Sequence, residues 1–383
     1  MQRTVRLELH PTPEQALALK ETLSQHTACF NAVAKQGWRE QTKNGVQLHK
    51  ETYADLRARF PQLPSQLVCA SRVKATEAIA SAMALAKRGK KVKGPQSPSC
   101  PIRYDARSYR VIRGENCVSL ASIAGRLKVR FGLYDHAAQF MDKAVGFDSA
   151  EVFCRKGKWF LHLVVTLEEP EVEETGEAIG VDFGITRPAV GSDNRFYGQK
   201  RWKNIERRYF KLKRLLQSKG SRSAKRHLKA LAVRVSRFRA DCDHVVSRRV
   251  VQNVSSGSVI VVENLTEIRQ RMKARKGTGL KRQMHQWSFA RLRGMLEYKG
   301  AEKACRVVGV DPCHTSQTCP CCGFKHRSNR RSQSLFHCRE CHFELNADLA
   351  AARNIAAKYL ASLGKSETGG RPVNAPIVSS CQA

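Results

Sequence analysis

The chain has 383 residues, of which 42% are apolar, and carries a formal net charge of +35 at pH 7. This length predicts two or three domains with hydrophobic cores, and the excess of 68 Lys and Arg over 33 Asp and Glu predicts a polyanionic partner, namely nucleic acid. No apolar stretch approaches a membrane span and the start does not have the pattern of a signal peptide, so we expect a cytoplasmic protein that does not contact a membrane.

The first part of the chain combines strand and helix patterns. Residues 1–10 alternate apolar and polar side chains, which is typical of a strand. The Thr-Pro-Glu-Gln sequence at 12–15 predicts a helix start with a capping box, and residues 65–87 show a second helical period. Strand-like alternation returns at 102–167. We expect these strands to form a barrel with the N-terminal strand, which makes residues 11–99 a helical insertion.

Composition also marks a boundary and a tail. The charge reverses abruptly in a glutamate-rich stretch, and residues 169–177 therefore predict a linker between domains. Residues 363–383 are rich in Gly, Ser and Pro, which predicts a disordered tail. The chain contains no P-loop, dinucleotide fingerprint or HExxH motif, which argues against ATP-driven, hydride-transfer and zinc-protease chemistry.

The second half has the order of an RNase H-like domain, with three successive strands followed by alternating helices and strands. The predicted elements are strands at 178–183, 188–192 and 195–199, a helical hairpin at about 203–250, a strand at 258–263, a helix at 287–303, a strand at 305–310 and a final helix. The hairpin is basic on both arms, which predicts contact with phosphates, although a merely solvated surface is the alternative.

Three acidic residues stand at the ends of these elements. Asp182 ends the first strand of the second half, Glu263 ends the fourth, and Asp348 opens the Ala-rich final helix. Each alone has a structural explanation, as a turn cap, a solvated strand end or a helix N-cap. In an RNase H-like domain the three positions meet, and such a carboxylate cluster holds paired Mg²⁺ or Mn²⁺ ions for phosphodiester hydrolysis. We therefore predict that these three residues are catalytic and bind metal.

Two CxxC pairs follow the last strand. Cys319 with Cys322 and Cys338 with Cys341 have the spacing of a zinc ribbon, here residues 312–343, and four thiolates satisfy a structural Zn²⁺ ion. Cys321 remains an alternative ligand, although its use breaks the CxxC spacing. Nearby histidines are predicted to lie outside the zinc shell: His314, His326, His337 and His342.

Taken in order, these motifs resemble the TnpB family, which are transposon-encoded, RNA-guided DNA endonucleases related to type V CRISPR effectors. The resemblance covers about residues 1–360. In the second half it is carried by Gly-Val-Asp-Phe-Gly at 180–184, Val-Val-Glu-Asn-Leu at 261–265, the helix from Trp-Ser-Phe at 287–289 to Tyr-Lys at 298–299, Thr-Ser-Gln-Thr-Cys at 315–319, the second knuckle at 338–341 and Ala-Asp-Leu-Ala-Ala-Ala-Arg-Asn-Ile at 347–355. The N-terminal strand with Pro11, Glu14-Gln15 and Asn31 is similar as well. One departure is Ala350, where the family usually has Asn.

The resemblance implies a multidomain fold of mixed α+β and α/β class. A wedge β-barrel (1–10 and 100–168) would carry an inserted recognition helix bundle (11–99), and a RuvC-like nuclease domain (178–311 and 344–362) would contain the zinc ribbon. It further implies a guide RNA, a double-stranded target DNA with an adjacent recognition motif, and a bacterial or archaeal host. Asp182, Glu263 and Asp348 would be the RuvC-like catalytic acids.

Two other functions remain open on the sequence. An RNA-guided DNA-binding repressor without cleavage would keep the basic surfaces and the ribbon but usually lack one acid, and all three acids are present. A strand-transferring transposase would use a similar acidic triad and would join its products instead of only cutting.

Overall fold

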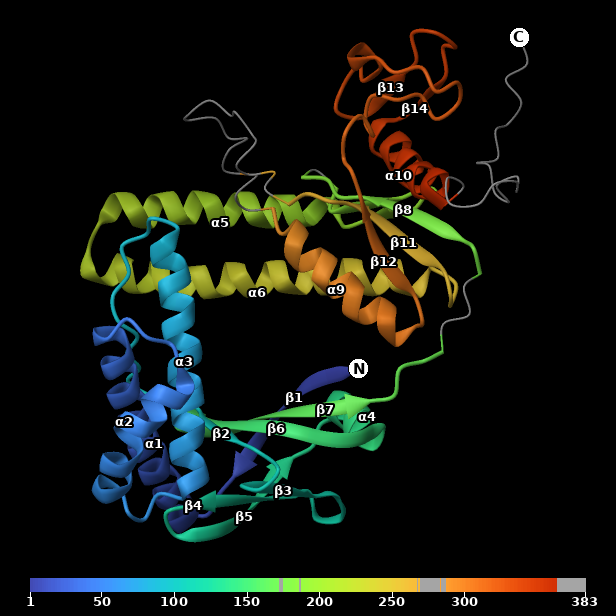
Figure 1. Cartoon of the computed structure of the whole chain (residues 1–383). Coiled ribbons are helices and arrows are strands. Elements are labelled where there is room, and N and C mark those ends of the chain that lie inside the picture. The colour runs from blue at the N-terminus through green and yellow to red at the C-terminus, as the bar shows by residue number, and fades with distance from the viewer. Residues whose placement is uncertain (172–174, 186, 267, 269–282, 284–286, 364–383) are drawn as a thin grey trace. The chain divides into compact units, whose positions relative to one another are not determined.

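The computed structural model describes residues 1–171, 175–185, 187–266, 268, 283 and 287–363, and the chain divides into two compact units, Met1–Glu168 and Glu169–Ala383 (Figure 1). The predicted tail lies outside the described residues from position 364 on. Among the helices that are described, none is long and apolar enough to cross a membrane.

The first unit is built on a seven-stranded antiparallel sheet with the order β2-β6-β7-β1-β5-β4-β3. Its strands are β1 (Gln2–His10), β2 (Ile102–Tyr104), β3 (Tyr109–Ile112), β4 (Cys117–Ser122), β5 (Gly125–Gly132), β6 (Ala144–Arg155) and β7 (Lys158–Leu167). The predicted N-terminal strand is confirmed: β1 lies between β5 and β7 and buries Val5, Leu7 and Leu9 on one face.

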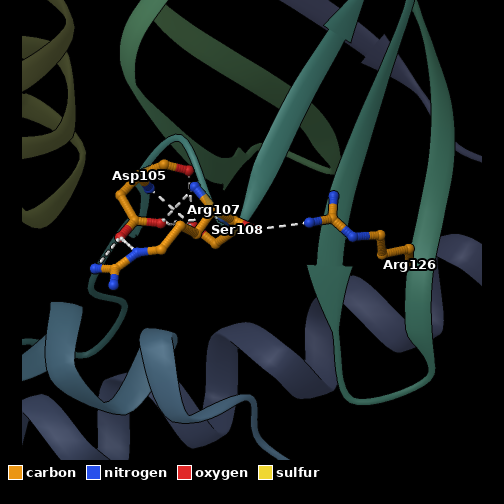
Figure 2. A network of polar contacts seen from close by, with 4 residues as sticks. All are labelled: Asp105, Arg107, Ser108 and Arg126. Atoms are coloured by element: carbon orange, nitrogen blue, oxygen red, sulfur yellow. Dashed lines mark hydrogen bonds and ion pairs between the residues drawn. The ribbon is translucent and has the colours of Figure 1, made fainter.

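A short turn joins the two edge strands, β2 and β3. The Asp105 carboxylate accepts hydrogen bonds from the Ser108 backbone N–H at 3.0 Å and from its hydroxyl at 2.7 Å, and Arg126 of β5 donates to a carbonyl of the same turn at 2.6 Å (Figure 2). The Tyr104 hydroxyl also donates to the Ala121 carbonyl of β4 at 3.1 Å. β2 and β3 are the two outer strands of the sheet, and the short turn keeps them close together, so the sheet curls until it is nearly closed. No pairing of β2 with β3 is found in the described residues, so the predicted barrel is not completed by a strand ladder.

Three helices are inserted between β1 and β2, as the sequence predicts: α1 (Pro13–Arg39), α2 (Gly45–Arg59) and α3 (Ser65–Lys87). The predicted capping box is present, since the Gln15 N–H donates to the Thr12 hydroxyl at 3.3 Å and the Thr12 N–H donates to the Gln15 side chain at 3.1 Å. The helices share one hydrophobic core with the sheet. The sequence did not predict α2 or the short α4 (Asp135–Asp142).

The second unit contains a five-stranded sheet with the order β10-β9-β8-β11-β12. Its strands are β8 (Ala178–Asp182), β9 (Ala189–Gly191), β10 (Phe196–Tyr197), β11 (Val259–Glu263) and β12 (Arg306–Val310). β8, β11 and β12 run parallel, whereas β9 is antiparallel to β8. All five strands predicted from the sequence are confirmed within one or two residues at their ends.

Helices cover both faces of this sheet, which explains why β11 is apolar from Val259 to Val262. On one face Ile260 and Val262 pack with the helices α6 (Arg222–Gln252) and α9 (Phe289–Glu302). On the other face Val259 and Val261 pack against Ile355 of α10 (Ala347–Leu363). The sheet is therefore the middle layer of a three-layer unit.

The predicted basic hairpin is confirmed as α5 (Lys200–Lys219) and α6, which run side by side (Figure 1). Gly220 takes the left-handed conformation at the turn, with a φ of 61°, and Ser221 caps α6 by accepting from the Ala224 N–H. The following basic side chains of the hairpin are exposed: Arg207, Arg208, Lys211, Lys213, Arg214, Lys225, Arg226, Lys229, Arg234 and Arg237.

Candidate active site and cysteine cluster

Two of the three predicted acids leave the same edge of the sheet on neighbouring strands. β8 and β11 are parallel, and their ladder pairs Val181 with Val262. The next residue on each strand is therefore an acid, Asp182 on β8 and Glu263 on β11. Because the carboxyl ends of parallel strands meet at one edge, the ladder itself sets these two side chains next to each other.

The third acid arrives on α10, which lies directly on β8. A Cβ atom at Gly180 would stand 2.0 Å from the Ala352 carbonyl oxygen and 2.7 Å from the Ala356 nitrogen, so only glycine permits this approach. Ala351 and Ala352 are buried, and Ala350 is buried against the cysteine cluster. Asp348 is one helical turn before Ala352 and thus stands at the end of β8, near Asp182.

Burial perturbs all three carboxylates, and the other two acids add to the shift of Asp182. Burial, reinforced by the charges of Glu263 and Asp348, raises the pKa of Asp182 to about 8. Burial also raises the pKa of Glu263 and of Asp348. Ionising all three acids together in this buried site is costly, so a bound cation would favour their charged forms, and such perturbed acids are concentrated at functional sites.

Basic side chains surround the acids and offset part of this burial. Arg330 pairs with Asp348 at 3.3 Å, and its positive charge lowers the pKa of that carboxyl. Lys203 of α5 also acts on Asp348, and Lys358 of α10 acts on Glu263 in the same direction. The acid cluster is therefore bordered by positive charge, which suits a phosphate backbone.

Hydrogen bonds tie the loop before the cysteine cluster to the acid cluster. The Thr315 hydroxyl, which is buried, donates to Glu263 Oε1 at 2.5 Å. The Asn354 side chain of α10 donates to the Thr315 and Thr318 carbonyls, each at 2.7 Å. Thr315 thus connects Glu263 of the sheet to the helix that carries Asp348.

The four cysteines predicted as zinc ligands converge, and their Sγ atoms all lie within 4.8 Å of one another: Cys319, Cys322, Cys338 and Cys341. The Cys319–Cys341 and Cys322–Cys338 sulfur atoms are 3.7 and 3.6 Å apart. Four thiolates around one Zn²⁺ at about 2.3 Å require sulfur separations of roughly 3.8 Å, so the donor set and its size fit zinc. β13 (Leu335–His337) and β14 (Glu344–Asn346) pair beside the cluster.

Cys321, the alternative ligand, lies outside this group of four in the described part of the chain. Its backbone N–H instead approaches Cys319 Sγ at 3.4 Å. Such N–H···S contacts stabilise a thiolate, so the Cys321 backbone N–H would stabilise the thiolate of Cys319.

Sequence reasoning missed three residues of the site: Thr315, Asn354 and Arg330. The first two lie in stretches that carry the family resemblance, at 315–319 and 347–355, so those motifs could have pointed to them. Arg330 lies in an arginine-rich run with no distinguishing pattern, and only the fold brings it to Asp348.

Comparison with known proteins gives two family matches. Residues 162–269 match a family described as "Probable transposase" (OrfB_IS605), and residues 289–355 match the Cas12f1-like TNB domain. Among curated proteins, a candidate RNA-guided DNA endonuclease, InsQ from Escherichia coli (strain K12), is 30% identical over 59% of this chain and 61% of its own length.

The TnpB-like protein MJ0751 from Methanocaldococcus jannaschii is 30% identical over 41% of this chain and 51% of its own length. This chain thus spans about two fifths to three fifths of the length of the curated relatives that it matches. Among solved structures, a Cas12f1–sgRNA–target DNA complex aligns over 94% of this chain and 100% of that chain, with 16% identity and a TM-score of 0.37. The two matched family segments contain all seven predicted site residues, and in them the chain is related in sequence to the TnpB-like proteins, which confirms the resemblance drawn from its motifs.

Proposed function

We propose that the chain is a metal-dependent endonuclease that cuts DNA at sites selected by a guide RNA, with Asp182, Glu263 and Asp348 as catalytic residues. The observation that carries the proposal is the meeting of three carboxylates from β8, β11 and α10. The strand order, with the first strand between the second and the fourth, supports an RNase H-like, RuvC-type domain at 178–311 and 344–362. The names of the relatives support the activity.

The carboxylate cluster fits divalent cations. Asp182, Glu263 and Asp348 offer oxygen ligands, which Mg²⁺ and Mn²⁺ prefer, and a bound cation would remove the cost of burying like charges together. A pair of such ions, when bound, supplies an activated water and stabilises the leaving oxygen in phosphodiester hydrolysis. The four-cysteine cluster, with no open position for substrate, would hold a structural Zn²⁺ instead.

The protein's own side chains would orient the reacting groups. Thr315 fixes one oxygen of Glu263 and leaves the other available. Arg330 uses one nitrogen for Asp348 and retains further N–H donors for a phosphate oxygen of the strand being cut. These contacts hold the acids in place before any substrate arrives, which lowers the reorganisation needed during hydrolysis.

Guide RNA and double-stranded target DNA are the proposed partners. The net charge of +35 and the exposed basic faces of α5 and α6 support phosphate binding. In this proposal sequence selection is by RNA–DNA pairing, while the first unit holds the RNA and reads a short motif beside the target. We assign residues 1–10 and 100–168 to the wedge domain, 11–99 to the recognition helices, 169–177 to the linker and 312–343 to the ribbon, and we place the protein in the cytoplasm.

The test compares cleavage with binding in the protein purified with its RNA. Asp182→Ala should lower Mg²⁺-dependent cleavage of a matched target by orders of magnitude and leave binding of that target unchanged, because the basic surfaces are untouched. The control is Asp241→Ala, which removes an exposed acid of the same unit. Cleavage by Asp182→Ala near the wild-type rate would contradict the proposal.

Two results would favour the other functions. A wild-type protein that binds matched DNA in Mg²⁺ and never cuts it would be a repressor. Joined products in place of free ends would identify a strand-transferring transposase.

A further inference from the structure

The second unit has a cavity of about 200 Å³ beside the acid cluster. Gly184 and Ile185, which follow Asp182 by two and three residues, line one side of it, and Lys203 lines another. Lys203 is also close enough to Asp348 for its charge to lower the pKa of that acid. The cavity is therefore linked to the acid cluster through Gly184, Ile185 and Lys203 and belongs to the same unit, but none of the three acids lines it.

The walls of this cavity are aromatic. Trp202 comes from α5, Phe238 from α6, and Trp287 and Phe289 from the start of α9. The Trp287 and Phe289 rings are 5.2 Å apart and tilted by 56°, so they present faces in different directions. A dry cavity of about 150 Å³ admits a benzene ring, so the larger volume has room for a flat heterocycle.

The cavity also offers polar groups at its edges. Gln199 Oε1 is buried there and has no hydrogen-bond partner among the described residues, so it can accept a hydrogen bond from a ligand. Lys203 and Arg207 bring positive charge, whereas Glu206 is paired with Arg239 at 2.8 Å and Asp243 with Arg291 at 2.7 Å. Stacking faces, an amide acceptor without a partner in the described part of the chain and cations beside it match a nucleobase on its phosphate backbone.

We propose that this cavity binds one unpaired base of the DNA strand that enters the acid cluster. The proposal rests on the proposed function, in which a strand must lie with a phosphate at Asp182, Glu263 and Asp348. A base next to that phosphate is out of the duplex when the strand lies in a single-strand path, and seating it in an aromatic pocket fixes the position of the backbone. The pocket thus sets which phosphate is cut.

The first experiment measures base binding without cleavage. A short single-stranded DNA carrying 2-aminopurine at successive positions is titrated with full-length Asp182→Ala protein in the absence of Mg²⁺. We expect quenching of the analogue's fluorescence at one position, with a loss in the same protein carrying Trp287→Leu or Trp202→Leu. Tyr298→Leu, which changes an aromatic residue of α9 outside the cavity, should preserve the quenching.

An abasic series then gives the size of the effect. Removing the seated base should weaken binding by roughly 5- to 150-fold, the range for one stacked base, and Trp287→Leu should abolish the difference between abasic and intact DNA. Equal effects of abasic sites at all positions, or an undiminished difference in Trp287→Leu, would overturn the proposal. These readouts need no cleavage, so they separate this proposal from the proposed nuclease activity.

Two further experiments test the proposal without relying on a variant that must fold, and identify which nucleic acid binds in the cavity. Photo-crosslinking of wild-type protein to DNA carrying 5-iodouracil at the quenched position should attach to Trp202, Trp287 or Phe289, and this result does not depend on any variant folding. Crosslinks elsewhere would contradict the assignment. If the fluorescence of 2-aminopurine is quenched in an RNA oligonucleotide but not in the DNA, the pocket belongs to the RNA and the proposal as stated is overturned.

Discussion

At the scale of single residues, the decisive contact is the hydrogen bond from the Thr315 hydroxyl to Glu263 Oε1 at 2.5 Å. Thr315 belongs to the loop before the first cysteine knuckle, and Glu263 belongs to the central sheet. A buried acid with one oxygen fixed has less freedom to turn away from a cation, so Thr315 acts as a positioning residue for Glu263.

Thr315→Val should therefore raise the Mg²⁺ concentration needed for half-maximal cleavage, with a loss of about 10- to 100-fold in metal affinity or rate, as for other partners of metal ligands. Valine keeps the volume and removes the hydroxyl. Thr315→Ser restores the hydroxyl and should recover most of the activity. Equal Mg²⁺ dependence in wild type and Thr315→Val would show that this hydrogen bond does not position Glu263.

The raised pKa of Asp182 predicts a pH dependence of stability without divalent cations. The folded protein keeps a proton on Asp182 up to about pH 8, whereas the unfolded chain loses it near its ordinary value of 3.8. The folded state binds more protons between these values, so its stability falls as pH rises from about 4 to 8.

Melting temperatures across this range test the sign. Asp182→Asn, which cannot ionise, should flatten the decline, and Mg²⁺ should raise the wild-type melting temperature most at the alkaline end, where the site is ionised. A decline of equal slope in Asp182→Asn would show that other groups cause it.

At the scale of elements, the position of Asp348 depends on how closely α10 approaches β8. Gly180→Ala would place a methyl group against the Ala352 carbonyl, where backbone must move. We expect a destabilisation of about 1–3 kcal/mol and a loss of cleavage, since the helix and its acid shift together. Gly294→Ala is the matched control, because a Cβ there meets nothing within 4 Å and lies in α9, where alanine is favourable.

The cysteine cluster is the second element that the site depends on. Cys338→Ser should remove bound zinc and, through the Thr315 and Asn354 contacts, also reduce cleavage. Cys313→Ser changes an exposed cysteine outside the group of four and should do neither. Metal analysis and cleavage on one preparation decide the question, and zinc that is retained in Cys338→Ser would rule out this ligand.

The sequence predicts most elements because its periodicities are strong, but it fails where the pattern is weak. β11 reads as four apolar residues followed by an acid, and β1 alternates polar and apolar residues from Thr4 to His10. α2 buries only Leu48 and Leu56, so its amphipathic pattern is too weak to detect. β2 has three residues, which is too short to show a clear alternation. At the site, the acids and cysteines were found because their spacing carries chemistry, whereas Arg330 meets Asp348 only after the ribbon has folded.

At the scale of the whole molecule, the net charge of +35 would govern the proposed association with nucleic acid. Exposed cations release counterions from the phosphate backbone, so Lys211→Gln with Arg214→Gln should weaken DNA or RNA binding and lower the salt slope of the logarithm of the affinity by roughly 2. Lys128→Gln should change little, because that ammonium is already paired with Glu115 at 2.5 Å. Binding isotherms at several salt concentrations measure both effects, and a slope unaffected by the double change would exclude the hairpin as a binding face.

The close packing of α10 on β8 has a consequence during synthesis. Asp182 and Glu263 are translated well before Asp348, at roughly 5–20 residues per second, so the third carboxylate leaves the ribosome on the order of 10 to 30 s after the first. From the completion of α6 until α10 follows, the nascent chain has the basic hairpin but only part of the acid cluster. On the proposed function, a ribosome-bound intermediate would therefore be able to hold nucleic acid before it is able to cut it.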